Sequence, residues 1–166
     1  MELWDLYTEK RIKTGETHLR GAPLPENRFH LVVHVWIVNA KGQYLISQRA
    51  ASRPSFPLKW ECVGGSVLLG ETSAEGAVRE VREEVGIAFS PEDGKLVRSI
   101  VRKNVGGTRF NDLLDIWLFP YEGEIPLESA TTDEVAGAKW MTKEEIRLLY
   151  RAGDFVPTLD YFFDIF

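Results

Sequence analysis

Hydrophobic residues recur most clearly at residues 30–38, HLVVHVWIV, a stretch that is also rich in β-branched residues. Both features are typical of a β-strand. Successive side chains on a strand point to opposite faces, so this segment has one aliphatic row and one row that carries two histidines and a tryptophan. The rows are Leu31, Val33, Val35 and Ile37 on one face, and His30, Val32, His34, Trp36 and Val38 on the other. The pattern predicts a strand with two chemically different faces.

Turn residues divide the rest of the chain into further elements. A first strand is expected at residues 2–8, followed by a polar connection through Pro25. The later expected elements are, in chain order, a turn at 40–43, a returning strand at 44–49, a loop at 52–60, a short strand at 60–63, a helix at 72–85, a hairpin of 95–105 and 108–121 around Gly106 and Gly107, a strand at 135–140, a helix from Thr142 and a short docked helix at 157–166. Strands mixed with helices in this way predict an α/β protein with a mixed sheet flanked by helices.

The helix at 72–85 carries an unusual cluster of acidic residues. At about 100° per residue, its apolar positions form one stripe, and Glu80, Glu83 and Glu84 fall in a neighbouring arc. The stripe consists of Ala74, Ala77, Val78, Val81 and Val85. Like charges three and four residues apart on a helix cost a few tenths of a kcal/mol per pair. Two interpretations fit: a charged outer face in which Arg79 pairs with Glu75 and Glu83, or a set of carboxylates that holds a cation.

Length, charge and cysteine content limit the class of protein. The chain has 166 residues, which suits a single domain over residues 1–166. Its net charge of −5 gives no support to a nucleic-acid polymer or an anionic membrane as partner. The longest apolar run is far too short to span a bilayer, and the first residues do not read as a secretory signal. Cys62 is the only cysteine, so we expect a cytoplasmic protein without disulfides.

The stretch GSVLLGETSAEGAVREVREEVGI at residues 65–87 resembles the signature of the Nudix hydrolase family. The positions that match are Gly65, Glu71, Arg79, Glu80, Val81, Glu83, Glu84, Gly86 and Ile87. They fill every fixed position of that signature, in a context where a loop leads into a helix. The resemblance implies the Nudix fold, an α/β/α sandwich around a mixed sheet. It also implies hydrolysis of a diphosphate linked to another group, with water as the nucleophile.

Carried onto this chain, the resemblance implies that Glu83 and Glu84 are the main metal ligands, assisted by Glu80 and the carbonyl group of Gly65. The residue types agree with this assignment. A glycine lets its backbone carbonyl approach an ion closely, and carboxylates at i, i+3 and i+4 supply hard oxygen ligands on one side of a helix. Such a site suits Mg²⁺ or Mn²⁺, with the remaining positions left to water and substrate phosphates.

The resemblance also implies roles around the metal. Glu71 and Arg79 would brace the loop and orient the carboxylates. The general base is either Glu83 or Glu134, and an acid solvated on a loop is the competing interpretation of Glu134. Arg49, at the end of the strand at 44–49, is a candidate contact to the substrate phosphates, and a surface salt bridge is its alternative.

The flanking sequence around residues 30–50 and Trp60 is similar to isopentenyl-diphosphate isomerase, which has a Nudix fold without being a hydrolase. His30 matches a metal-binding histidine of that isomerase. The isomerase, however, needs a catalytic cysteine and a nearby histidine where this chain has Gly64, Gly65 and Ser66. A third alternative is a non-catalytic module that binds a diphosphate, but such a module is expected to lose glutamates from the signature. We therefore predict a hydrolase of a soluble small-molecule diphosphate, with the attached group and a homodimer left open.

Overall fold

The computed structural model describes residues 1–105 and 107–166. The strands are β1 (Leu3–Tyr7), β2 (Lys13–Leu19), β3 (His30–Val38), β4 (Tyr44–Arg49), β5 (Trp60–Glu61), β6 (Val63–Ser66), β7 (Lys95–Val105), β8 (Thr108–Pro120) and β9 (Val135–Met141). The helices are α1 (Ser73–Val85), α2 (Lys143–Ala152) and α3 (Phe162–Ile165). Short 3₁₀ turns cover Pro91–Asp93, Leu127–Ser129 and Pro157–Leu159. Within the described ranges, no helix is long and apolar enough to cross a membrane.

A mixed sheet forms the centre of the molecule. Its strand order is β5-β4-β3-β8-β7, with β6 added to β3 and β9 added to β4. β3 and β8 run parallel over the whole of β3, whereas the other pairs in this sheet are antiparallel. β1 and β2 form a separate two-stranded sheet. This mixed topology confirms the predicted fold class.

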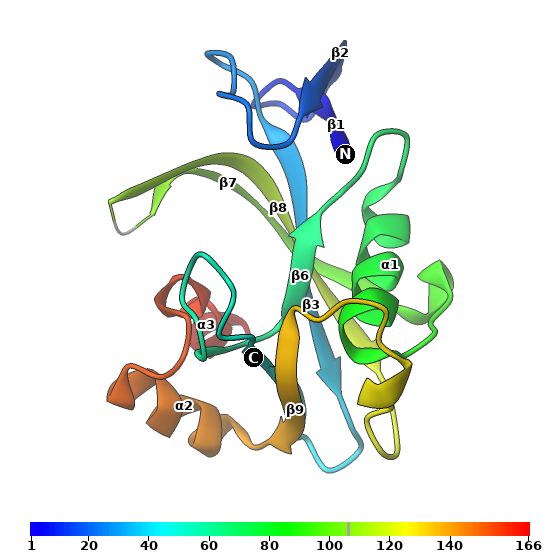
Figure 1. The fold of residues 1–166 in the computed structure, drawn as a ribbon, viewed down its shortest axis with the longest axis vertical. Coiled ribbons are helices and arrows are strands. Elements are labelled where there is room, and N and C mark those ends of the chain that lie inside the picture. The colour runs from blue at the N-terminus through cyan, green and yellow to red at the C-terminus, as the bar shows by residue number, and fades with distance from the viewer. Residues whose placement is uncertain (106) are drawn as a thin grey trace.

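Helices cover both faces of the sheet, as Figure 1 shows with α1 on one side and α2 and α3 on the other. The aliphatic row of β3 packs against the apolar stripe of α1, where Ala77, Val81 and Val85 are fully buried. The opposite row of β3 packs against the C-terminal segment, where the ring of Trp36 stacks on Phe162 at 4.6 Å. The two faces predicted for residues 30–38 therefore line two separate cores, which gives the α/β/α sandwich.

Local signals place the ends of α1. Thr72 is the N-cap, and its hydroxyl oxygen accepts a hydrogen bond from the backbone N–H of Glu75 while the Glu75 carboxylate accepts from the backbone N–H of Thr72. This capping box satisfies backbone donors that a helix start leaves free. Gly86 ends the helix with a φ of 79°, a conformation that glycine adopts without strain. The predicted helix at 72–85 is confirmed, and Thr142 caps α2 in the same way.

One prediction about strands is wrong, and one is confirmed over a short stretch. The connection expected between the first strand and Pro25 contains β2, whose residues are mostly exposed and therefore lack a strand's alternating pattern. Backbone pairing with β1 and the ion pair between Lys13 and Asp5 hold it in place. The returning strand expected at 44–49 is confirmed as β4, which pairs antiparallel with β3 where Val38 faces Tyr44 and continues between β5 and β9. The turn expected at Gly106 and Gly107 lies partly outside the described residues, since Gly106 is not among them.

Candidate active site

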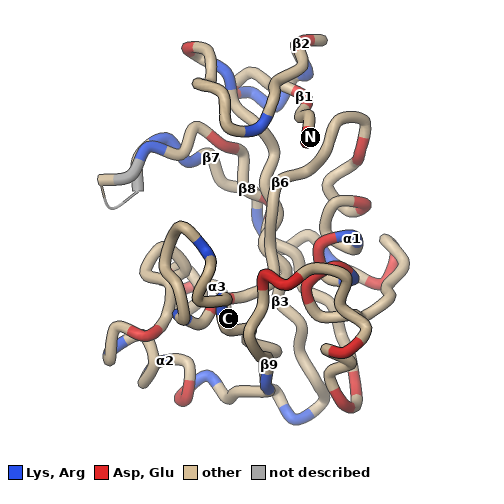
Figure 2. Tube along the Cα trace, in the orientation of Figure 1, with Lys and Arg blue, Asp and Glu red and all other residues tan. Residues whose placement is uncertain are grey.

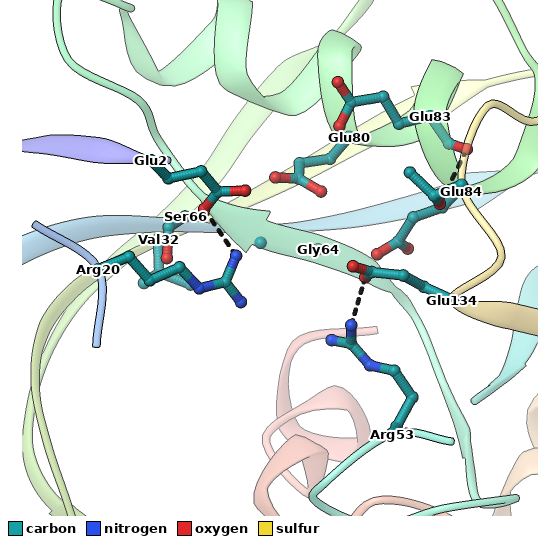
Figure 3. Close-up of a pocket in the computed structure, with 12 residues that line it drawn as sticks. Glu2, Arg20, Val32, Arg53, Gly64, Ser66, Glu80, Glu83, Glu84 and Glu134 are labelled. Atoms are coloured by element: carbon teal, nitrogen blue, oxygen red, sulfur yellow. Dashed lines mark hydrogen bonds and ion pairs between the residues drawn. The ribbon is translucent and has the colours of Figure 1, made fainter. Parts of the chain in front are cut away.

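A pocket of about 170 Å³ opens where β6, the acidic side of α1, the end of β2 and the start of β9 come together (Figure 3). Its lining is Glu2, Arg20, Val32, Arg53, Gly64, Gly65, Ser66, Glu80, Glu83, Glu84, Thr132 and Glu134. Figure 2 shows acidic residues along α1 and near the start of β9. All the residues predicted to bind metal therefore line one pocket, together with Glu134.

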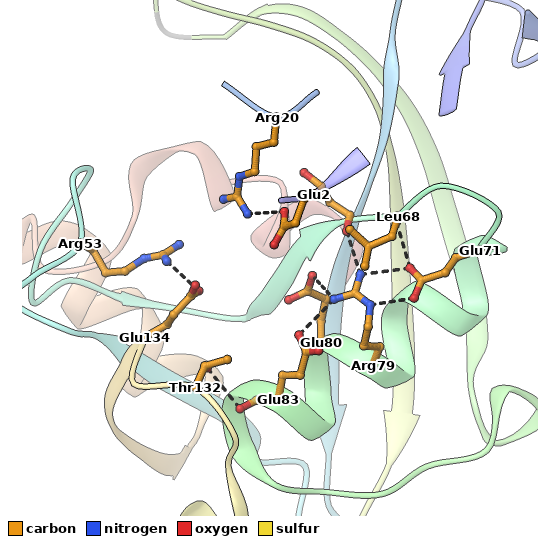
Figure 4. A network of polar contacts seen from close by, with 11 residues as sticks. Glu2, Arg20, Arg53, Leu68, Glu71, Arg79, Glu80, Glu83, Thr132 and Glu134 are labelled. Atoms are coloured by element: carbon orange, nitrogen blue, oxygen red, sulfur yellow. Dashed lines mark hydrogen bonds and ion pairs between the residues drawn. The ribbon is translucent and has the colours of Figure 1, made fainter. Parts of the chain in front are cut away.

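Arg79 organises the acidic side of α1 (Figure 4). Its Nε and Nη2 atoms donate to the two oxygens of Glu71 at 2.7 and 3.1 Å. Nη2 also donates to the carbonyl oxygen of Ser66 at 2.9 Å, and Nη1 donates to Glu80 at 2.8 Å and to Glu83 at 3.1 Å. One guanidinium thus links the loop before α1 to two of the clustered carboxylates, and its role in orienting metal ligands stays a prediction.

Glu71 contributes the other half of this brace. Its Oε2 atom accepts a hydrogen bond from the backbone N–H of Leu68 at 2.9 Å, so the loop between β6 and α1 is tied to the same carboxylate that holds Arg79. A bidentate carboxylate–arginine pair fixes orientation as well as charge. The positions of Glu80 and Glu83 on the helix are therefore coupled to the conformation of the loop that contains Gly65.

Burial and mutual repulsion raise the pKa of two of the clustered carboxyls. Glu84 is 5% exposed, and its Oε2 atom is buried without a hydrogen-bond partner in the part of the chain that the structure describes. Burial, followed by the charges of Glu80 and Glu61, holds the pKa of Glu84 well above its usual range. Burial also raises the pKa of Glu80 to about 7, although Arg79 opposes the shift. Both shifts indicate that these carboxylates lack a sufficient positive partner.

The donor set fits a hard divalent cation. The side chains offer oxygen atoms only, and the unpartnered oxygen of Glu84 belongs to this set. A Cβ atom at Gly65 would lie 2.3 Å from Oε1 of Glu80, so any larger residue there would displace the Glu80 carboxylate. As the side chains lie, no three acidic, histidine or cysteine groups among the described residues already surround a common point. Glu80 and Glu83 are turned to Arg79, so binding an ion requires their free oxygens or a small rotation.

Two arginines at the mouth of the pocket were missed by the sequence analysis. Arg53 forms an ion pair of 2.7 Å with Glu134, and Arg20 forms an ion pair of 2.6 Å with Glu2. Figure 3 shows both guanidinium groups beside the carboxylates and Gly64. Neither arginine belongs to the signature at 65–87, and a single arginine in a loop has no pattern by which a sequence identifies it.

Arg49 lies in a neighbouring cavity of about 150 Å³. Its Nη1 atom donates to Glu61 at 2.7 Å, and Nε and Nη2 donate to the backbone carbonyl and the hydroxyl of Ser55 at 2.8 and 3.2 Å. These contacts fasten the loop after β4. Arg49 is not part of the lining that contains the metal-binding candidates, and its contact with a phosphate stays a prediction.

The neighbouring cavity adjoins the carboxylate pocket, since Val32, Gly64 and Gly65 line both. Its wall includes His34, whose Nδ1 atom lies 2.7 Å from the hydroxyl oxygen of Tyr161. Burial holds the pKa of His34 well below its ordinary value, so this ring is neutral at physiological pH. The carboxylate pocket is thus acidic, whereas the charged residues that line the neighbouring cavity, Arg49 and Glu61, are paired with each other.

Cys62 and His30 bear on the isomerase alternative. Cys62 is 3% exposed, and burial raises the pKa of its thiol well above the ordinary value. Thiol reactivity requires the thiolate, so this environment favours a packing role. The His30 ring stacks on Trp4 at 4.1 Å, and burial lowers its pKa to about 4. Neither residue is among those that line the carboxylate pocket.

Comparison with known proteins shows that this fold is that of a family of hydrolases. The sequence model of the NUDIX domain matches residues 28–161. An uncharacterized Nudix hydrolase of Listeria monocytogenes is 38% identical over 98% of this chain and 91% of its own length. A solved structure of a Deinococcus radiodurans protein covers 93% of this chain and 92% of its own, with a TM-score of 0.72 and 25% identity.

The chain belongs to the Nudix hydrolase family. Isopentenyl-diphosphate Delta-isomerase of Escherichia coli is also similar, at 34% identity over 53% of this chain and 49% of its own length. That match spans about half of each protein, so the Listeria hydrolase is similar to far more of the chain. Members of the family act on small-molecule diphosphates and generally use divalent cations, which agrees with the chemistry of the pocket.

Proposed function

We propose that this protein hydrolyses a diphosphate bond in a soluble small molecule with the help of Mg²⁺ or Mn²⁺. The observation that carries the proposal is the buried, unpartnered oxygen of Glu84, which lies in one pocket with Glu80, Glu83 and Glu134. A bound cation would neutralise charge on the phosphates and lower the pKa of a water molecule. Burial of an unpaired carboxylate is otherwise unfavourable, so a bound cation would explain why Glu84 is buried at this position.

The pocket residues then take distinct roles. Glu83 and Glu84 hold the cation, Glu80 and the carbonyl of Gly65 complete its protein ligands, and the Arg79–Glu71 pair orients the carboxylates. A water oxygen forms a new bond to phosphorus, the bridging P–O bond breaks, and a carboxylate accepts the proton of the water. Glu83 and Glu134 are both candidates for that base.

The size of the carboxylate pocket indicates which part of the substrate it could hold. Sites that enclose a whole drug-sized ligand usually measure about 300–1,000 Å³, and the carboxylate pocket measures about 170 Å³. We propose that it takes the phosphates alone, and that the attached group extends across Gly64 towards His34 and the neighbouring cavity. Arg49 could reach a phosphate only by leaving Glu61 or Ser55.

The chain is proposed to act as one domain, and a cytoplasmic location and a homodimer stay predictions.

Isomerisation of isopentenyl diphosphate is the second candidate, because the Escherichia coli isomerases are similar over about half of the chain. That reaction moves a proton to and from carbon and needs an acid–base pair around an alkene. Gly64, Gly65 and Ser66 stand where the isomerase needs its catalytic cysteine and nearby histidine. Cys62 and His34 do line the neighbouring cavity beside Gly64, but burial lowers the pKa of His34, so its ring is neutral. The buried thiol of Cys62 lacks a lowered pKa. Hydrolysis is therefore the favoured reaction.

A panel of diphosphates tests the proposal. Purified protein is incubated with nucleoside di- and triphosphates, dinucleotides, sugar nucleotides and prenyl diphosphates, with Mg²⁺, with Mn²⁺ or with a chelator, and released phosphates are measured. We expect metal-dependent release from at least one compound and none from the triple variant Glu80/Glu83/Glu84→Gln. Conversion of isopentenyl diphosphate to its dimethylallyl isomer, with no release from any compound, would instead support the isomerase.

A further inference from the structure

We propose that Arg20, on the N-terminal hairpin of β1 and β2, binds the terminal phosphate of the substrate. The site would then prefer compounds whose outer phosphate carries no second ester group, such as R–O–PO₂–O–PO₃. This inference rests on the proposed hydrolase function and extends it to a class of substrate. The hairpin lies outside residues 28–161, the part of the chain that matches the NUDIX domain.

The structure fixes the hairpin against the loop that leads into α1. The backbone N–H of Leu69 donates to the carbonyl oxygen of Leu3 at 2.8 Å, and the N–H of Gly70 donates to Asp5 at 2.9 Å. Within the hairpin, the N–H of Arg20 donates to the carbonyl oxygen of Glu2 at 3.0 Å. These contacts hold the backbone of Arg20 at the rim of the pocket, and Figure 3 shows its guanidinium extending towards Gly64.

Arg20 is the more available of the two arginines in the pocket. Its side chain is 50% exposed and its partner Glu2 is 43% exposed, whereas the Arg53 side chain is 23% exposed. Exposed ion pairs contribute little to stability, because water solvates both partners well. Arg20 can therefore leave Glu2 for a substrate phosphate with little loss of stability. Its guanidinium can donate hydrogen bonds to two phosphate oxygens at once.

Charge distinguishes a terminal phosphate from an internal one. A terminal phosphate carries between one and two negative charges near neutral pH and three free oxygens. An internal phosphate, esterified on both sides, carries one charge and two free oxygens. The five glutamates among the lining residues repel either group, so an arginine at the rim favours the group with more charge and more acceptors. Arg20 is therefore placed to bind a terminal phosphate more tightly than an internal one.

A matched pair of probes tests the inference in the Mg²⁺-loaded protein. The first probe is methylenediphosphonate, and the second is its symmetric dimethyl ester, which has one methyl group on each phosphonate. Calorimetric titration gives a Kd for each. We expect wild type to bind the parent more tightly, and Arg20→Gln to weaken the parent about tenfold, which equals about 1.4 kcal/mol. In the same Arg20→Gln variant, the Kd of the ester should rise less than threefold. The Kd of the parent in Arg20→Lys should lie between those in wild type and Arg20→Gln.

Glu2→Gln separates a ligand role from a structural role. If Arg20 and Glu2 only close the hairpin, both neutral variants break the same pair and change binding in the same direction. If Arg20 binds phosphate, Glu2→Gln frees it and removes a nearby negative charge, so the parent probe should bind more tightly. Arg28→Gln is the control, because it breaks the ion pair with Glu16 on the same N-terminal region without touching the pocket.

Several results would overturn the inference. They are an equal loss for both probes in Arg20→Gln, weaker binding in Glu2→Gln, an effect of Arg28→Gln as large as that of Arg20→Gln, or no binding of either probe by wild type. The KM for the substrate found in the diphosphate panel gives a second readout in all variants. If the panel shows metal-dependent hydrolysis while Arg20→Gln leaves KM unchanged, the hydrolase proposal stands and the role of Arg20 is wrong.

Discussion

Replacement of Glu80 by glutamine should stabilise the metal-free protein at alkaline pH. The Glu80 side chain is 13% exposed, and its pKa is raised from 4.5 to about 7 by burial. A carboxyl whose pKa is raised on folding binds its proton more tightly in the folded state. Its contribution to stability therefore falls as pH rises from 4.5 towards 7, and the full penalty is present above 7. Glutamine keeps the shape and removes the charge.

The size of the effect follows from the pKa of Glu80. At about 1.36 kcal/mol per pKa unit, the rise from 4.5 to about 7 amounts to about 3 kcal/mol. For a chain of this length, 1 kcal/mol shifts Tm by about 2–4 °C, so Glu80→Gln should raise the Tm of the metal-free protein at pH 8 by up to about 6–12 °C. At pH 4.5 the two proteins should melt at nearly the same temperature.

Thermal melts in a chelator at pH 4.5, 6 and 8 measure this difference, and urea unfolding at pH 8 gives the free energy directly. Glu26→Gln is the control, because Glu26 is exposed and its replacement removes one negative charge without removing a buried one. Saturating Mg²⁺ should stabilise wild type, by about 2.7 kcal/mol at 100 times its Kd, and should stabilise Glu80→Gln less. A Glu80→Gln protein that melts at or below wild type at pH 8 in chelator would refute the assigned burial penalty. An equal response of both proteins to Mg²⁺ would refute the role of Glu80 in the site.

Three further changes test other parts of the site. Glu84→Gln should lower kcat at saturating Mg²⁺ by at least about 100-fold, while circular dichroism stays unchanged; near-normal turnover would contradict its role as a ligand. Gly65→Ala should displace the Glu80 carboxylate and abolish the rise in Tm with Mg²⁺, because the new Cβ would lie 2.3 Å from that group; a normal Mg²⁺ response would show that this close approach is unnecessary. Cys62→Ser should lower stability by about 1–3 kcal/mol through a buried hydroxyl and leave kcat within about twofold; loss of turnover with a stable fold would revive a catalytic thiol.

The sequence predicts the elements whose side chains alternate or repeat with a clear period. β3 and α1 were both expected, because β-branched alternation and a capped, amphipathic helix leave local signals that burial then reinforces. β2 was not expected, since its mostly exposed side chains carry no such alternation. The hairpin of β3 and β4 was expected and is confirmed, but its short extent was not expected. β6 pairs with β3 from Val32 to Val35, so β4 pairs with β3 only at its start and continues between β5 and β9. These pairings depend on tertiary contacts.

The residues of the candidate site fall into the same two groups, those that a local sequence pattern identifies and those that only tertiary contacts bring to the pocket. The resemblance at residues 65–87 identified the carboxylates, Glu71 and Arg79, because they lie within one segment of fixed spacing. Arg20 and Arg53 come from a hairpin and a loop whose places at the pocket are set by packing. Arg49, the arginine named from the sequence, is held by Glu61 and Ser55 in the adjoining cavity, and its contact with a phosphate stays a prediction. Residues of a site that are brought in by separate elements leave no pattern in the sequence.

The proposed function implies that metal binding and diphosphate binding depend on each other in this pocket. Five glutamates and two arginines are among its lining residues, and this excess of acid opposes the entry of an anionic substrate. A divalent cation removes much of the repulsion, and a diphosphate supplies oxygen ligands that Mg²⁺ otherwise takes from water. Coupling between two ligands is reciprocal, so the factor by which the cation raises diphosphate affinity equals the factor by which diphosphate raises cation affinity. Burial, and after it repulsion from neighbouring acids, keeps the pKa of Glu80 and Glu84 high in the free protein. We expect a bound cation to relieve that repulsion and so to favour binding of the substrate.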